Sequence, residues 1–590
     1  MADTTPLPLE IPPGFVKTDS PNAAKGRFIG GDKVRFVKGK PEKWAGWEQF
    51  IDDELTGIAR GAVSWVNQYG NTNIAFGTHL KLHVITGDDT LSDITPIRAS
   101  STINTDPFAM TNLSTTVTVT DTSHGADIND YVTFSGATAA GGITISGEYQ
   151  ITEIVDNNTY KIVHSSAATS TTTGGGASVT AAYQINTGSV GGTVGLGWGA
   201  GAWGEGAWST ARTEGIATEI RWWSLHEYGN DLLASPSLGG LFLWEEATDA
   251  RGEVVSGAPT SIRAMFVTGE RFVFALGTTS PMTVQWPDQD DITDWTPTAA
   301  NTANTRTLQS GSKLINGTSL SDGVNLVWSD TSLYLFQYTG TDFVYDSRLV
   351  GTNCGLAAPL GLAKVSGAAF WISGEQFFMY ASGVTPIPNQ DDVKDYVFGR
   401  MNIGQIAKTW AEYDQKNGQL RWHYCSGVET EPDSYVDVSI GDWVWTTGTR
   451  DRTTGTLYRP GDSSSLSVDA DGVIYIDNVG LDADGAAMES YIEFGLYALT
   501  NGKNNVDVMG IVPDCQRQTG DLTYEIYTKE RPNSDSNFDE QTVTMGEGEE
   551  IGDCRVSGRH FGMTVRSNEL GGDYRLGIVN LEIGQGGTRR

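Results

Sequence analysis

A group of four carboxylates lies in the sequence between two tryptophans, Trp286 and Trp295. A glycosidase needs one carboxylic acid and one carboxylate that are held apart across a sugar. Neighbouring carboxylates on one short loop do not establish that separation, whereas loop aspartates commonly accept hydrogen bonds from nearby backbone N–H groups. We therefore expect a structural loop with aspartate caps and keep a carbohydrate-active enzyme as an alternative. The four carboxylates are Asp288, Asp290, Asp291 and Asp294.

Two acidic turns and one histidine pair have spacings that could suit a metal ion. The segments 469–472 and 482–485 both have the pattern Asp-Ala-Asp-Gly, which resembles the start of a calcium loop. Both lack the third Asp or Asn before the glycine and the distal glutamate, so a hairpin turn is favoured. In a strand, His79 and His83 would lie about 13 Å apart along one face, too far to share a metal. We predict no metal site and place both histidines in the core or on the surface.

The sequence contains no signature of a nucleophile elbow, a metalloprotease or a phosphate-binding loop. Gly39-Lys40 is followed by Pro41, and no glycine stands five residues before Gly39. The four cysteines form no CxxC pair, so free thiols are favoured over zinc ligands or a disulfide framework. We therefore predict a protein that is not an enzyme, with no catalytic residues and no cofactor. The cysteines are Cys354, Cys425, Cys515 and Cys554.

Six residues have the type and spacing expected of contacts with a partner. Residues 33–36 alternate basic and apolar, which predicts a strand with one basic face that docks against an acidic partner or a phosphate backbone. A solvated strand face is the alternative. Three tryptophans recur every five residues in a glycine-rich stretch, and their rings need burial against their own blade or against a neighbouring subunit. The candidate contacts are Lys33, Arg35, Lys38, Trp198, Trp203 and Trp208.

The elements that would position these residues are short strands in a repeated pattern. Each repeat has an apolar strand, a tight polar turn, a second apolar strand, and a third strand that ends in an aromatic residue. The turn glycines lie 40, 54, 44 and 51 residues apart. This period is typical of β-propeller blades. With further copies near Gly70 and Gly472, we predict an all-β propeller of six or seven units. The turn glycines are Gly229, Gly269, Gly323, Gly367 and Gly418.

The charge balance is strongly acidic, with 39 lysines and arginines against 72 aspartates and glutamates, a net charge of −33. Tight binding to nucleic acid is disfavoured, because nucleic-acid binders are basic. An acidic wall can nevertheless surround DNA, since it repels the phosphates and lets the polymer slide. Solubility alone is the alternative explanation. No apolar run approaches the length of a membrane span, and residues 1–13 lack the pattern of a signal peptide.

Composition divides the chain of 590 residues into several parts. Prolines near the start predict an extended arm that frays or lies across a neighbouring subunit. A stretch rich in Thr, Ser and Gly interrupts the propeller and predicts a small inserted β-domain. One helix is expected, over Met401–Tyr413. The predicted parts are an arm with docking strands (1–57), a first propeller unit (58–100), the inserted β-domain (101–190), the propeller core (191–489) and a C-terminal β-sandwich (490–590).

The inserted segment resembles a β-module found in phage structural proteins. The resemblance rests on His124-Gly125, Asp130–Gly136, Gly147–Ile151 and Asn158–Tyr160. The module is similar to the first-catalytic-cysteine half-domain of ubiquitin-activating enzymes. It contains no cysteine, so ubiquitin chemistry is not expected. We expect an accessory domain, with surface attachment as a further option.

Most of the remaining chain resembles propeller proteins in the tails of short-tailed bacteriophages. The resemblance rests on Ile11–Phe15, Gly26–Trp44, Trp286–Thr298, Asn301–Ala303, Gly311–Gly317 and Tyr574–Gly577. It implies a subunit of the tail nozzle, a ring of six copies beneath the portal and adaptor that extends the channel for DNA ejection.

The implied partners are other copies of the chain, the tail adaptor protein, tail fibres or spikes, and genomic DNA that passes without specific binding. The implied location is the virion tail, after assembly in the host cytoplasm and without membrane insertion. The alternatives are a receptor-binding or fibre-attachment tail protein, with the inserted domain as adhesin, and a carbohydrate-active propeller enzyme.

Overall fold

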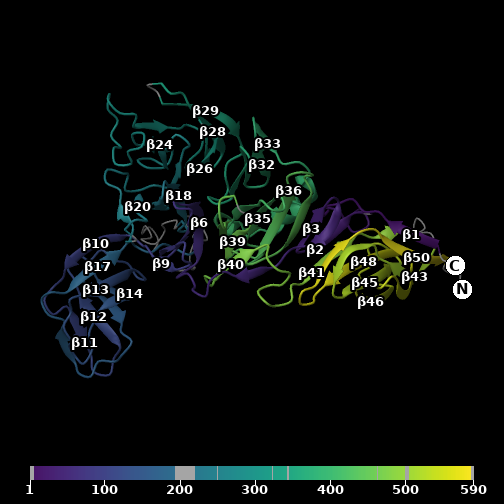
Figure 1. The fold of residues 1–590 in the computed structure, drawn as a ribbon, viewed down its shortest axis with the longest axis horizontal. Coiled ribbons are helices and arrows are strands. Elements are labelled where there is room, and N and C mark those ends of the chain that lie inside the picture. Colours follow the sequence, from purple (N-terminus) through teal and green to yellow (C-terminus); the bar gives the residue numbers. More distant parts are fainter. Residues whose placement is uncertain are drawn as a thin grey trace, which may run out of the picture. The chain divides into compact units, whose positions relative to one another are not determined.

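The computed structural model describes residues 5–24, 26–192, 219–248, 250–321, 323–341, 344–461, 463–498 and 504–585. Within these ranges the chain is almost entirely β-structure, as Figure 1 shows. In these ranges, helical structure is limited to the 3-10 helices η1 (Gln390–Asp392) and η2 (Ile403–Lys408) and the α-helix α1 (Lys394–Arg400). None of the helices described could cross a membrane, because none is long and apolar enough.

The helix predicted over residues 401–413 is wrong. The α-helix ends at Arg400, and the predicted stretch divides into η2 and the strand β34 (Trp410–Asp414). The Asn402 side chain accepts a hydrogen bond from the Gly404 N–H, which starts the short 3-10 turn. Trp410 then pairs with His423 on the next strand, so the strand pairing outweighs the helical spacing of the apolar residues.

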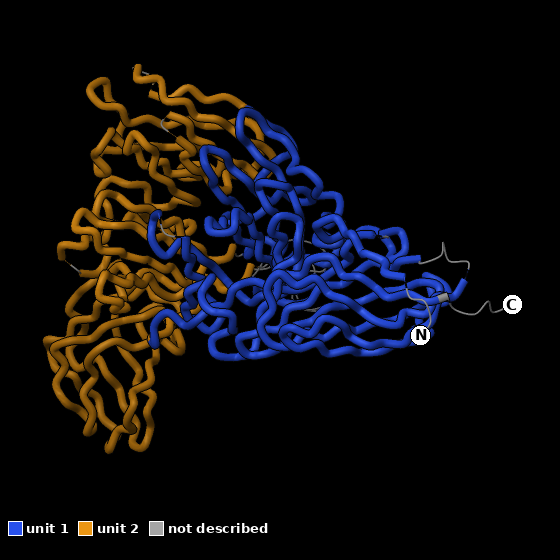
Figure 2. The backbone as a smooth tube through the Cα atoms, turned by 45° about the vertical axis from the view of Figure 1, so that its right-hand side comes forward, with its two compact units in different colours: residues 1–52, 350–590 blue, residues 53–349 orange. Residues whose placement is uncertain are grey.

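The chain divides into two compact units, shown in blue and orange in Figure 2. Unit 1 comprises residues 1–52 and 350–590, and unit 2 comprises residues 53–349. Unit 2 is therefore inserted, in sequence, into unit 1.

Unit 2 contains four antiparallel sheets of four strands, each built from strands consecutive along the chain, although the last strand of the fourth sheet runs on to Thr352. We call such sheets blades. The blades of unit 2 are β6 (Ala59–Val66), β7 (Thr72–Thr78), β8 (Leu82–Ile85) and β9 (Leu91–Asp93); β18 (Trp223–Tyr228), β19 (Asp231–Pro236), β20 (Phe242–Trp244) and β21 (Glu253–Val254); β22 (Ala264–Val267), β23 (Val273–Leu276), β24 (Thr283–Trp286) and β25 (Asn304–Thr307); and β26 (Leu314–Ser321), β27 (Val324–Ser329), β28 (Ser332–Tyr338) and β29 (Tyr345–Thr352).

Unit 1 contains three further blades, and the last takes its fourth strand from residues 1–52, which we call the N-terminal segment. The described residues thus contain seven blades, which confirms the predicted all-β propeller fold. The blades of unit 1 are β30 (Leu362–Val365), β31 (Ala368–Ile372), β32 (Phe377–Tyr380) and β33 (Val384–Pro386); β34 (Trp410–Asp414), β35 (Gln419–Tyr424), β36 (Ser434–Ser439) and β37 (Trp445–Thr449); and β38 (Thr454–Leu457), β39 (Ser465–Val468), β40 (Ile474–Asp477) and β5 (Trp47–Gln49).

The turn between the first two strands of a blade shows why the repeated glycines matter. At Gly418 the backbone has a φ of 65°, a left-handed conformation that glycine adopts without steric cost. At the repeat around Gly269 the left-handed residue is instead Arg271, with a φ of 66°. The spacing of the glycines therefore locates the repeats correctly, although in the turn at Gly269 the left-handed residue comes two positions later.

The inserted domain, in unit 2, is an eight-stranded antiparallel sheet with its own hydrophobic core. Its longest strand, β14, pairs with β13 along its first half and with β15 along its second half, so the sheet folds over the core. The strands are β10 (Ile97–Thr102), β11 (Phe108–Met110), β12 (Thr116–Thr120), β13 (Tyr131–Ser135), β14 (Gly147–Asp156), β15 (Thr159–Val163), β16 (Thr172–Gly174) and β17 (Thr180–Gln184).

The C-terminal sandwich consists of three sheets, and each contains at least one strand from the first 43 residues. The N-terminal strands are β1 (Thr5–Leu9), β2 (Phe28–Asp32), β3 (Val34–Val37) and β4 (Lys40–Lys43). The others are β41 (Ser490–Phe494), β42 (Tyr497–Ala498), β43 (Val506–Val512), β44 (Cys515–Thr519), β45 (Leu522–Lys529), β46 (Asp539–Met545), β47 (Gly552–Gly558), β48 (His560–Ser567), β49 (Asp573–Leu576) and β50 (Val579–Gln585).

The separate N-terminal arm that we expected is therefore not present as such. β1 pairs with β50, β2 with β41, and β4 with β49. Pro6 and Pro8 occupy alternate positions of β1, and a strand with alternating prolines can donate hydrogen bonds to one side only. The arm thus packs on its own chain and closes the edge of its sheet.

Candidate functional site

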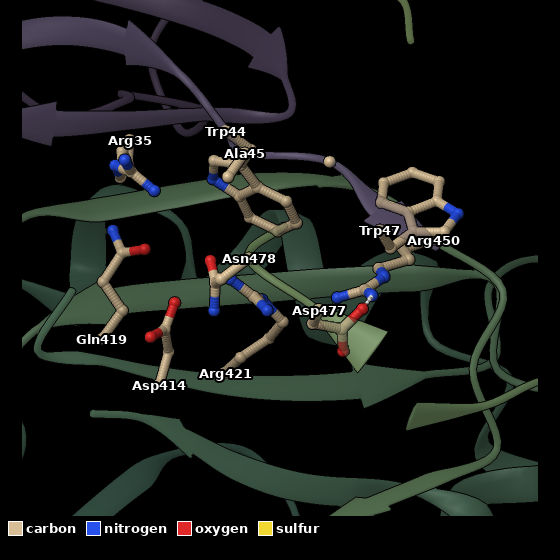
Figure 3. A pocket seen from close by; sticks show the side chains of 11 residues that line it. Arg35, Trp44, Ala45, Trp47, Asp414, Gln419, Arg421, Arg450, Asp477 and Asn478 are labelled. Carbon is tan, nitrogen blue, oxygen red and sulfur yellow. Dashed lines mark hydrogen bonds and ion pairs between the residues drawn. The ribbon is translucent and has the colours of Figure 1, made fainter. Parts of the chain in front are cut away.

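The N-terminal segment runs from the sandwich of unit 1 to its last blade over a group of buried charges (Figure 3). We call these charges the charge cluster. Three of them, Arg421, Arg450 and Asp477, line a cavity of about 10 Å³. Arg35 and residues 44–47 line it from the N-terminal segment, and the remaining lining residues lie in or next to the last two blades. The charge cluster consists of Glu412, Arg421, His423, Asp437, Arg450 and Asp477.

Arg421 lies at the centre of the charge cluster. The register of the sheet places Glu412, Arg421 and Asp437 directly opposite one another on the adjacent strands β34, β35 and β36. Arg421 Nη1 lies 2.6 Å from Glu412 Oε1, and Arg421 Nη2 lies 3.0 Å from Asp437 Oδ2. The Trp44 ring covers the guanidinium, with its centroid 3.9 Å away. A buried cation is therefore held between two carboxylates under an aromatic ring.

The same contacts shift the pKa values of these groups. Burial lowers the pKa of Arg421, but the carboxylates of Asp437 and Glu412 outweigh it, so the pKa lies above its usual range. Burial raises the pKa of Glu412, but Arg421 and His423 bring it well below its usual range. Both groups are therefore charged at neutral pH.

His423 completes this part of the charge cluster. Its Nε2 lies 3.3 Å from Glu412 Oε1, and its ring stacks on Trp410 with 4.2 Å between centroids. Burial lowers the pKa of His423 to about 4. The imidazole is therefore neutral at pH 7, and the Nε2–H donates to the carboxylate.

A second ion pair lies beside the first, between Arg450 and Asp477. The Trp47 ring lies over Arg450, with its centroid 5.1 Å from the guanidinium carbon. Both aromatic covers, Trp44 and Trp47, therefore come from the N-terminal segment. Since a cavity of about 10 Å³ holds one water molecule at most, the charge cluster has no room for a substrate.

Two of the six predicted partner contacts are satisfied within the chain. Lys33 Nζ lies 2.8 Å from Asp32, and Arg35 Nη2 lies 2.6 Å from Glu42. Both side chains thus have an acidic partner within the same chain, and their role as contacts with another protein stays a prediction. Lys38 is exposed in the following turn, and its role as a contact stays a prediction. Trp198, Trp203 and Trp208 lie outside the described residues.

The aspartates between Trp286 and Trp295 bind their own loop. Asp288 Oδ1 accepts a hydrogen bond from the Thr302 N–H at 2.7 Å, and Asp291 Oδ1 accepts one from the Thr293 N–H at 2.9 Å. Hydrogen bonds with Thr302 and Thr293 lower the pKa values of Asp288 and Asp291. A glycosidase needs a general acid whose pKa is raised. The pKa values of Asp288 and Asp291 are lowered, which is the opposite shift.

The possible metal-binding residues make local hydrogen bonds as well. Asp469 Oδ1 accepts from the backbone N–H groups of Asp471 and Val473, which closes the hairpin between β39 and β40. His79 Nδ1 accepts from the Ile58 N–H at 3.0 Å. In the part of the chain that the structure describes, no three His, Cys, Asp or Glu side chains are placed to hold a metal ion. The four cysteines are free thiols.

His83 gives a prediction for pH dependence. Its Nε2 accepts from the Thr56 N–H at 3.3 Å, and burial lowers its pKa to about 4. The unfolded chain takes up a proton near pH 6.5, so folding stability is present above pH 6.5 and is lost as the pH falls towards 4. The expected loss is about 3 kcal/mol, at about 1.4 kcal/mol per pH unit.

The measurement is urea unfolding of the wild type and of His83→Gln between pH 7 and pH 4. Glutamine keeps an acceptor for Thr56 but does not titrate. The stability of the variant should fall less steeply with decreasing pH. Identical slopes for the two proteins would show that His83 has no such role.

Sequence reasoning did not find the charge cluster. The available signal was the arginine at position 421 within Gln419–Tyr424, a strand whose six residues are all buried. A charge in a buried strand needs a partner. The partners could not be named, because they depend on the register of three strands.

Comparisons with known proteins add little to this description. No family model matches the chain, and no curated protein matches it. Among solved structures, a chain of "Crystal Structure of Mitotic Checkpoint Complex" is similar at 10% identity and a TM-score of 0.30, covering 65% of this chain and 96% of that one. "Phage phi92 endosialidase" is similar at 11% identity and a TM-score of 0.20, covering 96% of this chain and 70% of that one. Similarity at this level identifies no function.

Proposed function

We propose that the protein is a structural subunit of a phage tail nozzle, a ring that extends the channel for DNA ejection. The observation that carries the proposal is the distribution of charge. Among the described residues, seven basic and seven acidic side chains are buried. The buried charges among the described residues therefore balance, so they do not account for the net charge of −33 of the chain.

A solvent-facing acidic excess suits a conduit for DNA. It repels the phosphate backbone, so DNA passes without being trapped, whereas a binding protein presents clustered lysines and arginines. Some basic side chains are instead paired with acidic side chains of the same chain, as Arg421 and Arg35 are. The resemblance of the blade segments to short-tailed phage tail proteins agrees with this role.

The purified chain is expected not to retard double-stranded DNA in an electrophoretic assay, even at low salt. The physical reason is the outward acidic excess, and low salt is the condition that favours electrostatic binding most. A basic DNA-binding protein serves as the positive control. Saturable binding that weakens as salt rises would contradict the proposed surface.

The location of the protein in the particle tests the proposal directly. Antibodies against the purified chain, seen by electron microscopy of intact particles, should decorate the tail at the point where DNA leaves. Labelling of the capsid, or of fibre tips away from the DNA exit, would rule out a nozzle subunit.

A fibre-attachment or receptor-binding role is the second candidate, and the inserted domain favours it. That domain has a separate hydrophobic core, and the exposed fractions of its Leu113 and Val163 are 83% and 50%. Exposed apolar side chains on a separate domain are typical of contact surfaces. Particles that carry a chain without residues 97–184 should still form tails but fail to adsorb if this second role is correct.

A further inference from the structure

The sandwich of unit 1 contains a second, larger cavity, which we call the socket. Its volume is about 170 Å³. A cavity of about 150 Å³ takes up a molecule of benzene, so the socket has room for one apolar side chain. Its apolar walls include Leu9, Phe28, Phe494 and Ile578, and its charged residues are Glu10 and Lys40.

The two charged residues of the socket have no partner in the described part of the chain. Neither the exposed Glu10 nor the half-buried Lys40 forms an ion pair there. The neighbouring strand β1 carries Pro6 and Pro8, which disfavour pairing with a further strand. A partner would therefore engage the socket by inserting a side chain, with one acidic and one basic group at its edge.

The turn between β35 and β36 presents an exposed apolar side chain. Val428 is 87% exposed, more than any other large hydrophobic side chain described. The turn is held by a hydrogen bond from the Glu429 N–H to the Ser426 carbonyl oxygen at 2.9 Å. The Gly427 N–H donates to the Arg400 carbonyl oxygen at 2.7 Å. The valine is thus presented by an ordered turn, which lowers the entropic cost of a contact.

The charges around Val428 match those of the socket. Glu429 follows Val428 directly and is exposed. Arg400 lies beside the turn through its bond to Gly427, and its side chain is exposed over the Tyr396 ring. We call Val428, Glu429 and Arg400 the knob. The knob has an apolar tip with one acidic and one basic neighbour, and the socket has apolar side chains in its walls with one basic and one acidic residue.

We propose that the knob of one copy inserts into the socket of a second copy. Val428 would enter the cavity, Glu429 would pair with Lys40, and Arg400 would pair with Glu10. Knob and socket are different surfaces, so the contact is head-to-tail, and head-to-tail contacts generate closed rings when the rotation closes. The inference deepens the proposed function and rests on it, because a nozzle subunit forms a ring.

The test is the association of the full-length chain, measured by sedimentation velocity and native mass spectrometry. The wild type should form a ring-sized oligomer. Val428→Asp places a charge at the tip of the knob, and Ile578→Trp fills the socket. Each should weaken association by about thirtyfold or more, as expected for the centre of an interface. Leu113→Asp, a change at a similarly exposed apolar residue of the inserted domain, should leave association unchanged.

A charge exchange separates a broken contact from a damaged fold. Lys40→Glu alone and Glu429→Lys alone should each weaken association by about tenfold. The double variant restores opposite charges and should associate within about threefold of the wild type. Rescue of this kind is not expected from two changes that merely destabilise the subunit.

The outcomes also separate this inference from the proposed function. If Val428→Asp and Ile578→Trp associate like the wild type, or if the double charge variant is no better than the single ones, the knob–socket contact is wrong, whereas a nozzle built through another surface stands. A wild type that stays monomeric at its highest soluble concentration also overturns the contact. A nozzle is excluded separately, by particles labelled away from the DNA exit.

Discussion

Replacing Arg421 by methionine is expected to lower the free energy of unfolding by about 3–5 kcal/mol. The change removes the cation between Glu412 and Asp437 and leaves two buried carboxylates without their partner. It also removes the cation beneath the Trp44 ring. Breaking one partner of a buried ion pair is costly because the remaining charge has lost water without compensation.

The measurement is urea unfolding followed by tryptophan fluorescence, together with hydrogen exchange of the amides in β34, β35 and β36. Exchange should accelerate in these three strands first, because the lost stability is local to their sheet. The matched control is Lys394→Met, which breaks the ion pair of Lys394 with the exposed Asp391. That change should cost less than about 1 kcal/mol, since surface ion pairs contribute little.

A triple variant identifies the cause of the loss. Glu412→Gln, Arg421→Met and Asp437→Leu together remove all three charges and keep similar volumes. Because no charge is left unpaired, the triple variant should recover at least half of the stability lost in Arg421→Met. If it is no more stable than the single variant, shape rather than charge determines the effect.

Deleting residues 1–49 is expected to abolish folding of the C-terminal sandwich. The deletion removes strands from all three of its sheets, and it removes β5 from the last blade. It also removes Leu9, Phe15, Phe28 and Val34 from the hydrophobic core of the sandwich. Buried apolar side chains of this kind stabilise by about 1.5–3 kcal/mol each, and a domain is stable by only about 5–15 kcal/mol in total. The measurement is the soluble yield and the resistance of residues 490–585 to protease.

A cleavage experiment provides the control for this deletion. Asp52–Glu54 is exposed and follows the last N-terminal strand, so a specific protease site can replace it. Cutting the folded chain there should leave the fragment 1–52 bound, because strand pairing and core contacts hold it. Release of the fragment after the cut, with an intact sandwich, would show that the N-terminal strands are dispensable.

The sequence alone predicted the parts of the fold that depend on local patterns. The repeated strand–turn–strand pattern, with turn glycines such as Gly323 and Gly418, predicted propeller blades, and the structure contains seven of them among the described residues. The Thr-rich segment predicted a separate β-domain, which extends over Ile97–Gln184. Both signals come from residues close together in the chain, where turn chemistry and alternation act directly.

The tertiary structure decided which distant segments meet. Thr5 pairs with Ile583, and Trp47 pairs with Asp477, although hundreds of residues separate the partners. A strand pattern gives no information about its partner, because many strands have the same alternation. The row of Glu412, Arg421 and Asp437 depends on register in the same way. Turns and strand alternation are therefore determined by residues close together in the sequence. The partners of the N-terminal strands and of the buried charges are determined only when the sheets assemble.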